Sequence, residues 1–350
     1  MDRNKILSCF ISTMFSLLFS IHTGSCVEVI TPTITITHNL TIEEYRIAKN
    51  VDELLKKAEC FDLRCVPEGI LTKREKWRSR SCGDLLDEIN KQLKALGYRF
   101  AKKDQLNSDF YKGTKLLFSN LQDIRGFSFN VSKTRFIFIA NHNKPERTEV
   151  GILFLDGKIT DIPLYHGHGP LFWGEKILKL SQVENSSRQK KFEYDSQDVD
   201  KETVNIYSGD KVIYKFEFVD YPFDYAIQRF YVQNGHWVLE FMKAETEGKK
   251  VRDYHGTVVV DGVNLNERYG EEEIFNYIYI KGKPFYFFKD KSGYTRIKNS
   301  NITLPLKYEE VKHYDCCSYS AFNPRWNDDM IWFYGIKDGY LHYVEAGVYE

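Results

Sequence analysis

The chain has 350 residues, which is enough for one large domain or two smaller ones. Its 49 basic and 49 acidic side chains cancel, so no overall electrostatic field exists to attract nucleic acid or an anionic membrane surface. The 25 Phe and 23 Tyr residues favour pleated, half-buried surfaces, and the composition therefore predicts β structure.

The first residues are typical of a secretory signal. Two basic side chains precede an uncharged apolar run over 6–21, and small residues follow it. Thr23 and Ser25 stand at positions −3 and −1 for cleavage before Cys26, so we expect residues 1–25 to be a signal peptide and the protein to be exported. The apolar run is shorter than the roughly 20 residues of a membrane-spanning helix, and an uncleaved anchor is the alternative.

Membrane attachment through a lipid is a further alternative at this end of the chain. Residues 23–26 read Thr-Gly-Ser-Cys and are similar to a bacterial lipobox, in which the cysteine is lipidated. They depart from it at Thr23, where that box has a branched apolar residue. A lipid anchor at Cys26 is thus the one membrane link that we retain as an expectation.

Export also bears on the remaining cysteines and on four glycosylation sequons. An oxidising compartment predicts disulfides, but the five cysteines are an odd number, so one thiol stays free or Cys26 is a sixth member. These cysteines are Cys60, Cys65, Cys82, Cys316 and Cys317.

Four glycosylation sequons begin at Asn39, Asn130, Asn185 and Asn301 and matter only in a host that glycosylates its secreted proteins.

Residues 26–104 form an N-terminal segment with its own character. An alternating Thr-Ile run over 33–37 predicts a strand, and helical apolar spacing predicts helices over 51–59 and 84–96. Because Cys60 closes the first helix and Cys82 opens the second, a disulfide between them is the natural structural interpretation. The β-rich domain is then expected over 105–350.

Short strands and tight turns repeat through that domain. Residue pairs that tolerate positive φ predict two-residue hairpins at Lys112-Gly113, Asp156-Gly157, Ser208-Gly209, Asp261-Gly262, Asn299-Ser300 and Ala346-Gly347. Bulky apolar runs predict strands over 135–140, 176–180, 236–242, 284–288 and 330–334. Repeats of roughly 40 to 50 residues with four strands each are typical of propeller blades.

The predicted fold is therefore mainly β and β-propeller-like, with five blades and a small N-terminal helical segment. The N-terminal strands are expected to complete the last blade, because propellers commonly close their ring in this way. Six blades, or a β-sandwich with irregular loops, are the alternatives.

Several motifs in the C-terminal half carry a resemblance. They include Gly235-His236-Trp237-Val238-Leu239-Glu240, Gly282-Lys283-Pro284-Phe285-Tyr286-Phe287-Phe288, His313-Tyr314-x-Cys316-Cys317 and Met330-x-Trp332-Phe333-Tyr334. With them, the sequence resembles a group of exported bacterial proteins that carry no assigned function, over roughly 85–350. The resemblance implies export and propeller-like repeats, and it implies no activity.

The loop before the strand at 330–334 is the candidate binding site. Adjacent cysteines close on each other only through a strained ring, which occurs at binding surfaces or redox switches, while cysteines paired separately are ordinary staples. Aromatic and cationic side chains surround this pair, and such residues supply contact energy at interfaces. The residues predicted to contact a ligand or partner are Tyr314, Cys316, Cys317, Tyr319, Arg325 and Trp326. The alternative is that the aromatic side chains pack inward.

The sequence contains no phosphate loop, dinucleotide fingerprint, nucleophile elbow or zinc-protease motif, so we predict no cofactor and assign no catalytic residue. The absence of these motifs does not exclude an enzyme, because propellers assemble sites from side chains far apart in the sequence. His166-Gly167-His168 offers two imidazoles without a third ligand, and no metal site is predicted there. Runs of carboxylates at 271–273 and 328–329 lack the spacing of a calcium loop and are interpreted as solvated faces.

Two functions remain as expectations. The favoured one is an exported, non-catalytic binding or scaffold module that contacts a protein, peptide or glycan. The alternative is an extracytoplasmic hydrolase or lyase acting on a glycan, which needs carboxylates that converge in a pocket. Carboxylates that converge in a pocket would favour the enzyme, and a pocket lined by apolar side chains would favour the binding module.

Overall fold

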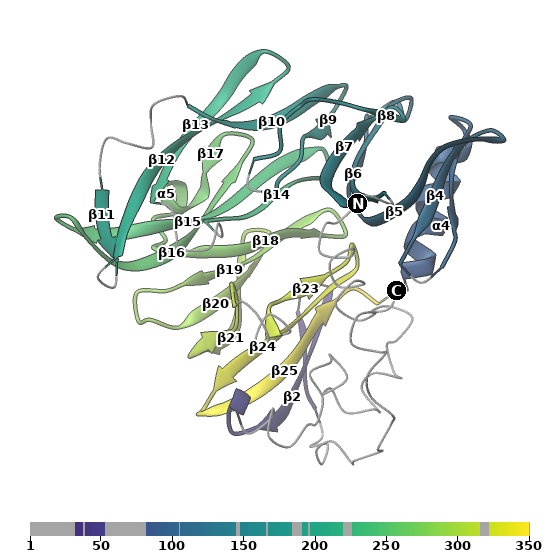
Figure 1. Ribbon diagram of the computed structural model, residues 1–350. Helices are drawn as coiled ribbons and strands as arrows, with labels where there is room; N and C mark the ends of the chain where they lie inside the picture. The colour runs from purple at the N-terminus through teal and green to yellow at the C-terminus, as the bar shows by residue number, and fades with distance from the viewer. Residues whose placement is uncertain are drawn as a thin grey trace. The chain divides into compact units, whose positions relative to one another are not determined.

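The computed structural model describes residues 32–37, 39–52, 82–104, 106–144, 148–165, 167–183, 191–194, 197–219, 226–315 and 322–349. Over these residues the protein is mainly β, with antiparallel sheets and short helices (Figure 1), which confirms the predicted class. Two compact units divide the chain. Among the described residues, those between 82 and 268 belong to unit 1, and those of 32–52 and 269–349 belong to unit 2.

The first sheet of unit 1 is an antiparallel meander in chain order. Its strands are β3 (Tyr98–Lys102), β4 (Ser108–Lys112), β5 (Lys115–Phe129), β6 (Phe136–Asn143), β7 (Thr148–Leu155) and β8 (Lys158–Ile159). Helix α4 (Cys82–Lys94) lies beside it (Figure 1), with Ile89 and Leu93 buried in the same core. The predicted helix over 84–96 is thus confirmed, displaced by two residues.

Phenylalanine dominates the core of this sheet. Phe138 is fully buried, and its ring centroid lies 4.6 Å from that of Phe154, 5.2 Å from that of Phe127 and 5.3 Å from those of Phe100 and Phe110. Offset-stacked and edge-on rings at such separations add stability beyond the area they bury. The centre of unit 1 therefore depends on a few large rings.

Asn130 organises the loop between β5 and β6. Its side chain is buried, and Oδ1 accepts hydrogen bonds from the backbone N–H groups of Thr134 and Arg135, each at 2.8 Å. The Nδ2 group donates to Ser132 Oγ at 2.8 Å, to Thr134 Oγ1 at 2.9 Å and to the carboxylate of Glu175. One amide thus satisfies most of the polar groups of this turn.

The second sheet of unit 1 has nine strands and contains two meanders. One consists of β9 (Leu171–Trp173), β10 (Lys176–Gln182), β12 (Gln197–Ser208) and β13 (Lys211–Val219), and the other of β14 (Ile227–Gln233), β15 (His236–Glu247), β16 (Lys250–Val260) and β17 (Val263–Asn264). Strand β11 (Lys191–Tyr194) joins them, because it pairs antiparallel with β12 and parallel with β16. Helix α5 (Leu265–Tyr269) follows β17.

Unit 2 contains two sheets that share one hydrophobic core. The four-stranded sheet runs in the order β18 (Ile274–Ile280), β19 (Lys283–Lys289), β20 (Thr295–Asn299) and β21 (Ile302–Tyr308). The six-stranded sheet runs in the order β1 (Thr33–Thr37), β2 (Leu40–Ala48), β25 (Tyr340–Gly347), β24 (Met330–Lys337) and β22 (Glu310–Val311), with β23 (Arg325–Trp326) also on β24. The N-terminal strands therefore complete the last sheet, as expected.

The described part of the predicted N-terminal segment, 26–104, has residues in both compact units. Strands β1 and β2 belong to unit 2, whereas α4 and β3 belong to unit 1. Of the helix predicted over 51–59, only the first two residues are described, and both are helical. The proposed Cys60–Cys82 disulfide falls outside the described residues.

Five of the six predicted turns join neighbouring strands, and the sixth is wrong. Ala346-Gly347 lies inside β25, where Gly347 pairs with Met330 on one side and Thr41 on the other. A Cβ atom on Gly347 would lie 2.6 Å from Met330 Cβ, so close packing, not a turn, requires glycine here. All five predicted strands are confirmed within β6, β10, β15, β19 and β24.

We expect unit 2 to lose stability on mild acidification because of His342 in β25. Burial is the main cause that lowers the pKa of His342, and its Nδ1 atom has no hydrogen-bond partner. The unfolded chain therefore takes up a proton, near its usual pKa of about 6.5, before the folded chain does. Stability is full above that pH and falls as pH decreases through it.

Urea unfolding of wild type and His342→Gln at pH 8 and pH 5.5 measures this effect. The wild type should lose more stability between the two pH values than the variant does. His236→Gln is the control, since that side chain is 44% exposed. Equal losses in wild type and His342→Gln would contradict the assignment.

Candidate functional site

The residues predicted to contact a partner differ in their exposure, among those that the structure describes. Cys316, Cys317 and Tyr319 lie outside the described residues. Tyr314 and Arg325 are partly buried, whereas Trp326 in β23 is only 4% exposed and belongs to the shared core of unit 2. The prediction for Trp326 is thereby corrected: its indole packs inward, so it is not available for direct contact with a partner.

His313 anchors the start of this loop. Its ring stacks on Phe275, with centroids 3.7 Å apart and planes 10° from parallel, and the ring of Tyr314 meets it edge-on at 4.6 Å. Nδ1 lies 2.6 Å from the carbonyl oxygen of Val311, so Nδ1 carries a proton and donates it. The opposite atom, Nε2, faces Glu273 Oε1 at 3.4 Å and becomes a second donor when the imidazole is protonated.

A reciprocal pair of hydrogen bonds closes the loop at its two ends. The backbone N–H of Asp315 donates to Asn323 Oδ1 at 2.9 Å, and Asn323 Nδ2 donates to the carbonyl oxygen of Asp315 at 2.8 Å. Burial raises the pKa of the Asp315 carboxyl. Arg325 then pairs with Trp332 in the ladder of β23 and β24. We call His313, Tyr314, Asp315, Asn323 and Arg325 the loop base.

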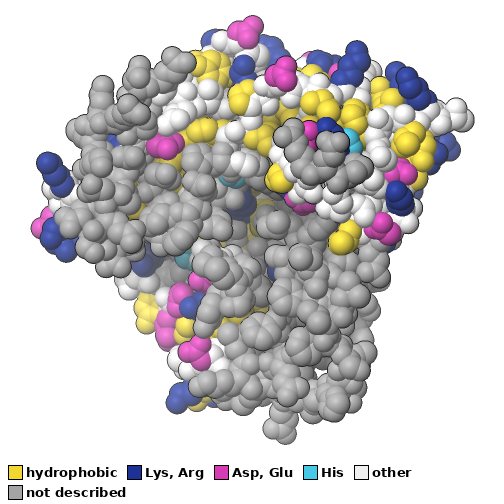
Figure 2. Space-filling model, viewed as in Figure 1, with side chains coloured by type: hydrophobic (Ala, Val, Ile, Leu, Met, Phe, Trp, Pro, Cys, Tyr) yellow, Lys and Arg dark blue, Asp and Glu magenta, His cyan; other side chains and the backbone are white. Residues whose placement is uncertain are grey.

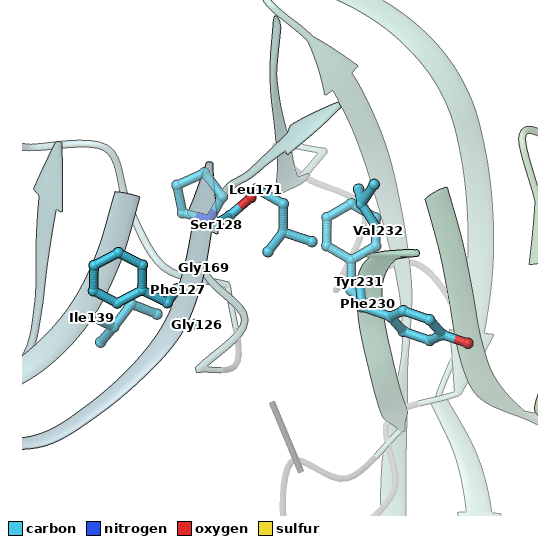
Figure 3. Close-up of a pocket in the computed structure, with 10 residues that line it drawn as sticks. Gly126, Phe127, Ser128, Ile139, Gly169, Leu171, Phe230, Tyr231 and Val232 are labelled. Atoms are coloured by element: carbon cyan, nitrogen blue, oxygen red, sulfur yellow. The ribbon is translucent and has the colours of Figure 1, made fainter. Parts of the chain in front are cut away.

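A small cavity lies within unit 1, between β5, the segment that leads into β9, and β14. Figure 3 shows Phe127 and Ile139 on one side, Phe230, Tyr231 and Val232 on the other, and Leu171 between them. Its volume of about 30 Å³ is room for water, far below the roughly 300 Å³ at which ligand pockets begin. None of its lining side chains is a carboxylate or an imidazole.

The buried ionisable groups of unit 1 have structural partners. Arg229 pairs with Glu240 across β14 and β15, and the hydroxyl of Tyr165 donates to Glu202. His168 Nε2 lies 2.9 Å from the carbonyl oxygen of Ile227, and His166 lies outside the described residues. Within the described ranges, no group of three or more His, Cys, Asp or Glu side chains is arranged to hold a metal ion.

Two buried carboxylates that the sequence analysis missed face each other in unit 2. Glu43 on β2 and Glu345 on β25 are directly opposite in the ladder and are 3% and 0% exposed. Each accepts a hydrogen bond from a tyrosine of its own strand, at 2.5 Å from Tyr45 and 2.7 Å from Tyr343. The mirrored spacing, Glu-x-Tyr on one strand and Tyr-x-Glu on the other, was the sequence signal that could have found them.

The surface carries both signs of charge. Figure 2 shows Lys and Arg side chains close to Asp and Glu side chains over the described part of the visible face. Among helices with described coordinates, none is both long enough and apolar enough to cross a membrane.

Comparisons with known proteins add little at this point. No protein family model matches the chain, and no curated protein is similar to it. The crystal structure of the polysaccharide lyase Uly1 matches at 13% identity over 91% of this chain and 78% of that chain, with a TM-score of 0.28. The acylaminoacyl peptidase of Pyrococcus horikoshii matches at 11% identity over 88% of this chain and 43% of its own, with a TM-score of 0.30. TM-scores this low carry no argument about fold or function.

Proposed function

We propose that the protein is an exported, non-catalytic binding or scaffold module that contacts its partner through the loop base and the loop it supports. The supporting observation is the reciprocal Asp315–Asn323 hydrogen-bond pair, which fixes both ends of the loop before any ligand arrives. Fixing the ends in advance lowers the ordering cost of binding. Tyr314 and Arg325 are residue types that carry contact energy at interfaces.

The partner in this proposal is a protein, a peptide or a glycan. The proposal includes Cys316, Cys317 and Tyr319 in the same surface, since they lie within five residues of Tyr314 in the sequence. The alternative, a glycan-active hydrolase or lyase, draws on the opposed Glu43 and Glu345 carboxylates. Their burial disfavours that alternative, because a catalytic carboxylate must reach its substrate.

The experiment compares wild type with Arg325→Ala on arrays of peptides and glycans. Arg325→Ala should weaken binding roughly five- to thirtyfold, as expected for loss of about 1–2 kcal/mol at an interface arginine. Arg252→Ala is the matched control, because Arg252 is an exposed arginine of unit 1. Equal binding by wild type and Arg325→Ala contradicts the proposed surface. Release of sugar fragments by wild type that stops in Glu345→Gln would instead favour the enzyme.

We also propose that the mature chain begins near Cys26 outside the cytoplasm. The uncharged apolar run and the small residues that follow it support this proposal. N-terminal sequencing of protein recovered outside the cytoplasm tests it, and an intact Met1 in that material would defeat it. Mass spectrometry of the same N-terminal peptide would reveal a lipid on Cys26.

A five-bladed propeller is our proposal for the architecture. Five antiparallel groups of four to six strands support it, since they follow one another in chain order and the last is completed by β1 and β2. An experimental structure tests it by the number of sheets that surround one axis.

A further inference from the structure

Strand β1 is an edge strand that exposes apolar side chains. It pairs with β2, and among the described residues no strand pairs with its other edge. Ile34 is 54% exposed and Ile36 is 77% exposed. Natural edge strands are usually protected by lysine, proline or a bulge, and β1 contains none of these within Thr33–Thr37.

The register of the hairpin decides which backbone groups face the open edge. Thr37 pairs with Leu40 across a two-residue connection, so these two residues exchange hydrogen bonds with each other. Alternate residues of an antiparallel strand direct their N–H and C=O groups to opposite sides. The groups of Thr33, Thr35 and Thr37 therefore bond to β2, and those of Ile34 and Ile36 point to the open edge.

The sequence of β1 is a palindrome, Thr-Ile-Thr-Ile-Thr. A two-fold axis through Thr35 would place Ile34 opposite the partner's Ile36 and Thr35 opposite the partner's Thr35. The residues whose backbone groups point to the open edge would then form the hydrogen-bonded pairs, each exchanging both of its bonds. Because Ile34 and Ile36 share one face of the strand, four isoleucines from two copies would form one apolar cluster.

We propose that the open edge of β1 binds the β1 strand of a second copy of this chain, antiparallel and with Thr35 on the two-fold axis. A two-fold interface must be self-complementary. A palindromic strand meets this condition, because equivalent side chains lie opposite each other on the same face and the backbone groups of the two strands match as donors and acceptors. The absence of charge along β1 removes any repulsion between the two copies. The proposal is independent of the function proposed for the loop base.

Sedimentation over a range of protein concentrations tests the dimer. Wild type should dimerise as its concentration rises, and Ile36→Lys should weaken dimerisation about tenfold or more, since both copies lose an apolar contact and gain a positive charge. Val150→Lys is the matched control, because Val150 is 74% exposed on β7 of unit 1. A wild type that stays monomeric, or an Ile36→Lys variant that dimerises like wild type, overturns the proposal.

Cysteine cross-linking tests the register. In a pair without hydrogen bonds the two Cα atoms at Thr35 lie roughly 4.5 Å apart, within the range that a disulfide spans, so Thr35→Cys should form a disulfide between copies, identified by peptide mapping. Ile36→Cys should not, because its own counterpart is a diagonal neighbour at roughly 7–8 Å. A wild-type dimer in which Ile36→Cys cross-links and Thr35→Cys does not would overturn the register.

Discussion

Replacing Phe138 with alanine is expected to destabilise unit 1 by about 3–5 kcal/mol, the usual cost of deleting a fully buried phenylalanine. Five other phenylalanine rings lie within 6.3 Å of this ring, which is 0% exposed, so its loss leaves a cavity that rigid neighbours cannot fill. Denaturant unfolding followed by circular dichroism measures the change. Phe138→Leu should lose much less, because it keeps most of the apolar volume.

Phe118→Ala is the control for this experiment. Phe118 also contacts Phe154, with ring centroids 4.9 Å apart, but its side chain is only partly buried. It should therefore lose clearly less stability than Phe138→Ala. Equal losses at the two sites would show that Phe138 is not the centre of the core.

The second large effect is expected at the buried ion pair of β14 and β15. Glu240 is 0% exposed and Arg229 is 8% exposed, so Glu240→Ala leaves a guanidinium in the interior without its main counter-charge. Breaking a buried pair in this way costs about 3–5 kcal/mol. Denaturant unfolding at neutral pH measures it.

Two further variants separate charge from packing. The double variant Arg229→Met with Glu240→Leu should recover most of the lost stability, because apolar residues of similar size replace a buried pair at little cost. Glu247→Ala, which breaks an exposed pair with Arg252, should cost at most about 1 kcal/mol. A double variant as unstable as Glu240→Ala would show that the loss arises from packing.

Local pattern was sufficient to predict six of the strands and five of the turns. Apolar runs such as 236–242 and Asp-Gly pairs such as Asp261-Gly262 specify their conformation within a few residues, and the structure confirms both. Ala346-Gly347 failed because the need for glycine arises from Met330, on a neighbouring strand. That β2 and α4 belong to different units likewise depends on pairing between β2 and β25, which lie far apart in the sequence.

The site was harder to predict than the fold. Trp326 suits a surface and a core equally well, and only its pairing with Ile331 beside the core of unit 2 decides between them. The opposition of Glu43 and Glu345 requires the register of two strands that are distant in sequence. The Asp315–Asn323 hydrogen bonds join the backbone N–H and C=O of one residue to one side-chain amide with no motif, so composition and spacing could not reveal them.

The hydrogen bonds of Asn130 have a consequence for covalent modification. Asn130 begins a sequon, and the nitrogen that would carry an oligosaccharide is the Nδ2 atom that donates to Ser132, Thr134 and Glu175. In the folded protein that nitrogen is buried, so a sugar on it would have to expel the loop that the amide holds together. The sequons at Asn39 and Asn301 stand instead on exposed hairpin turns. The three sequons therefore share one sequence pattern but differ in the folded protein, where Asn39 and Asn301 are exposed and Asn130 is buried.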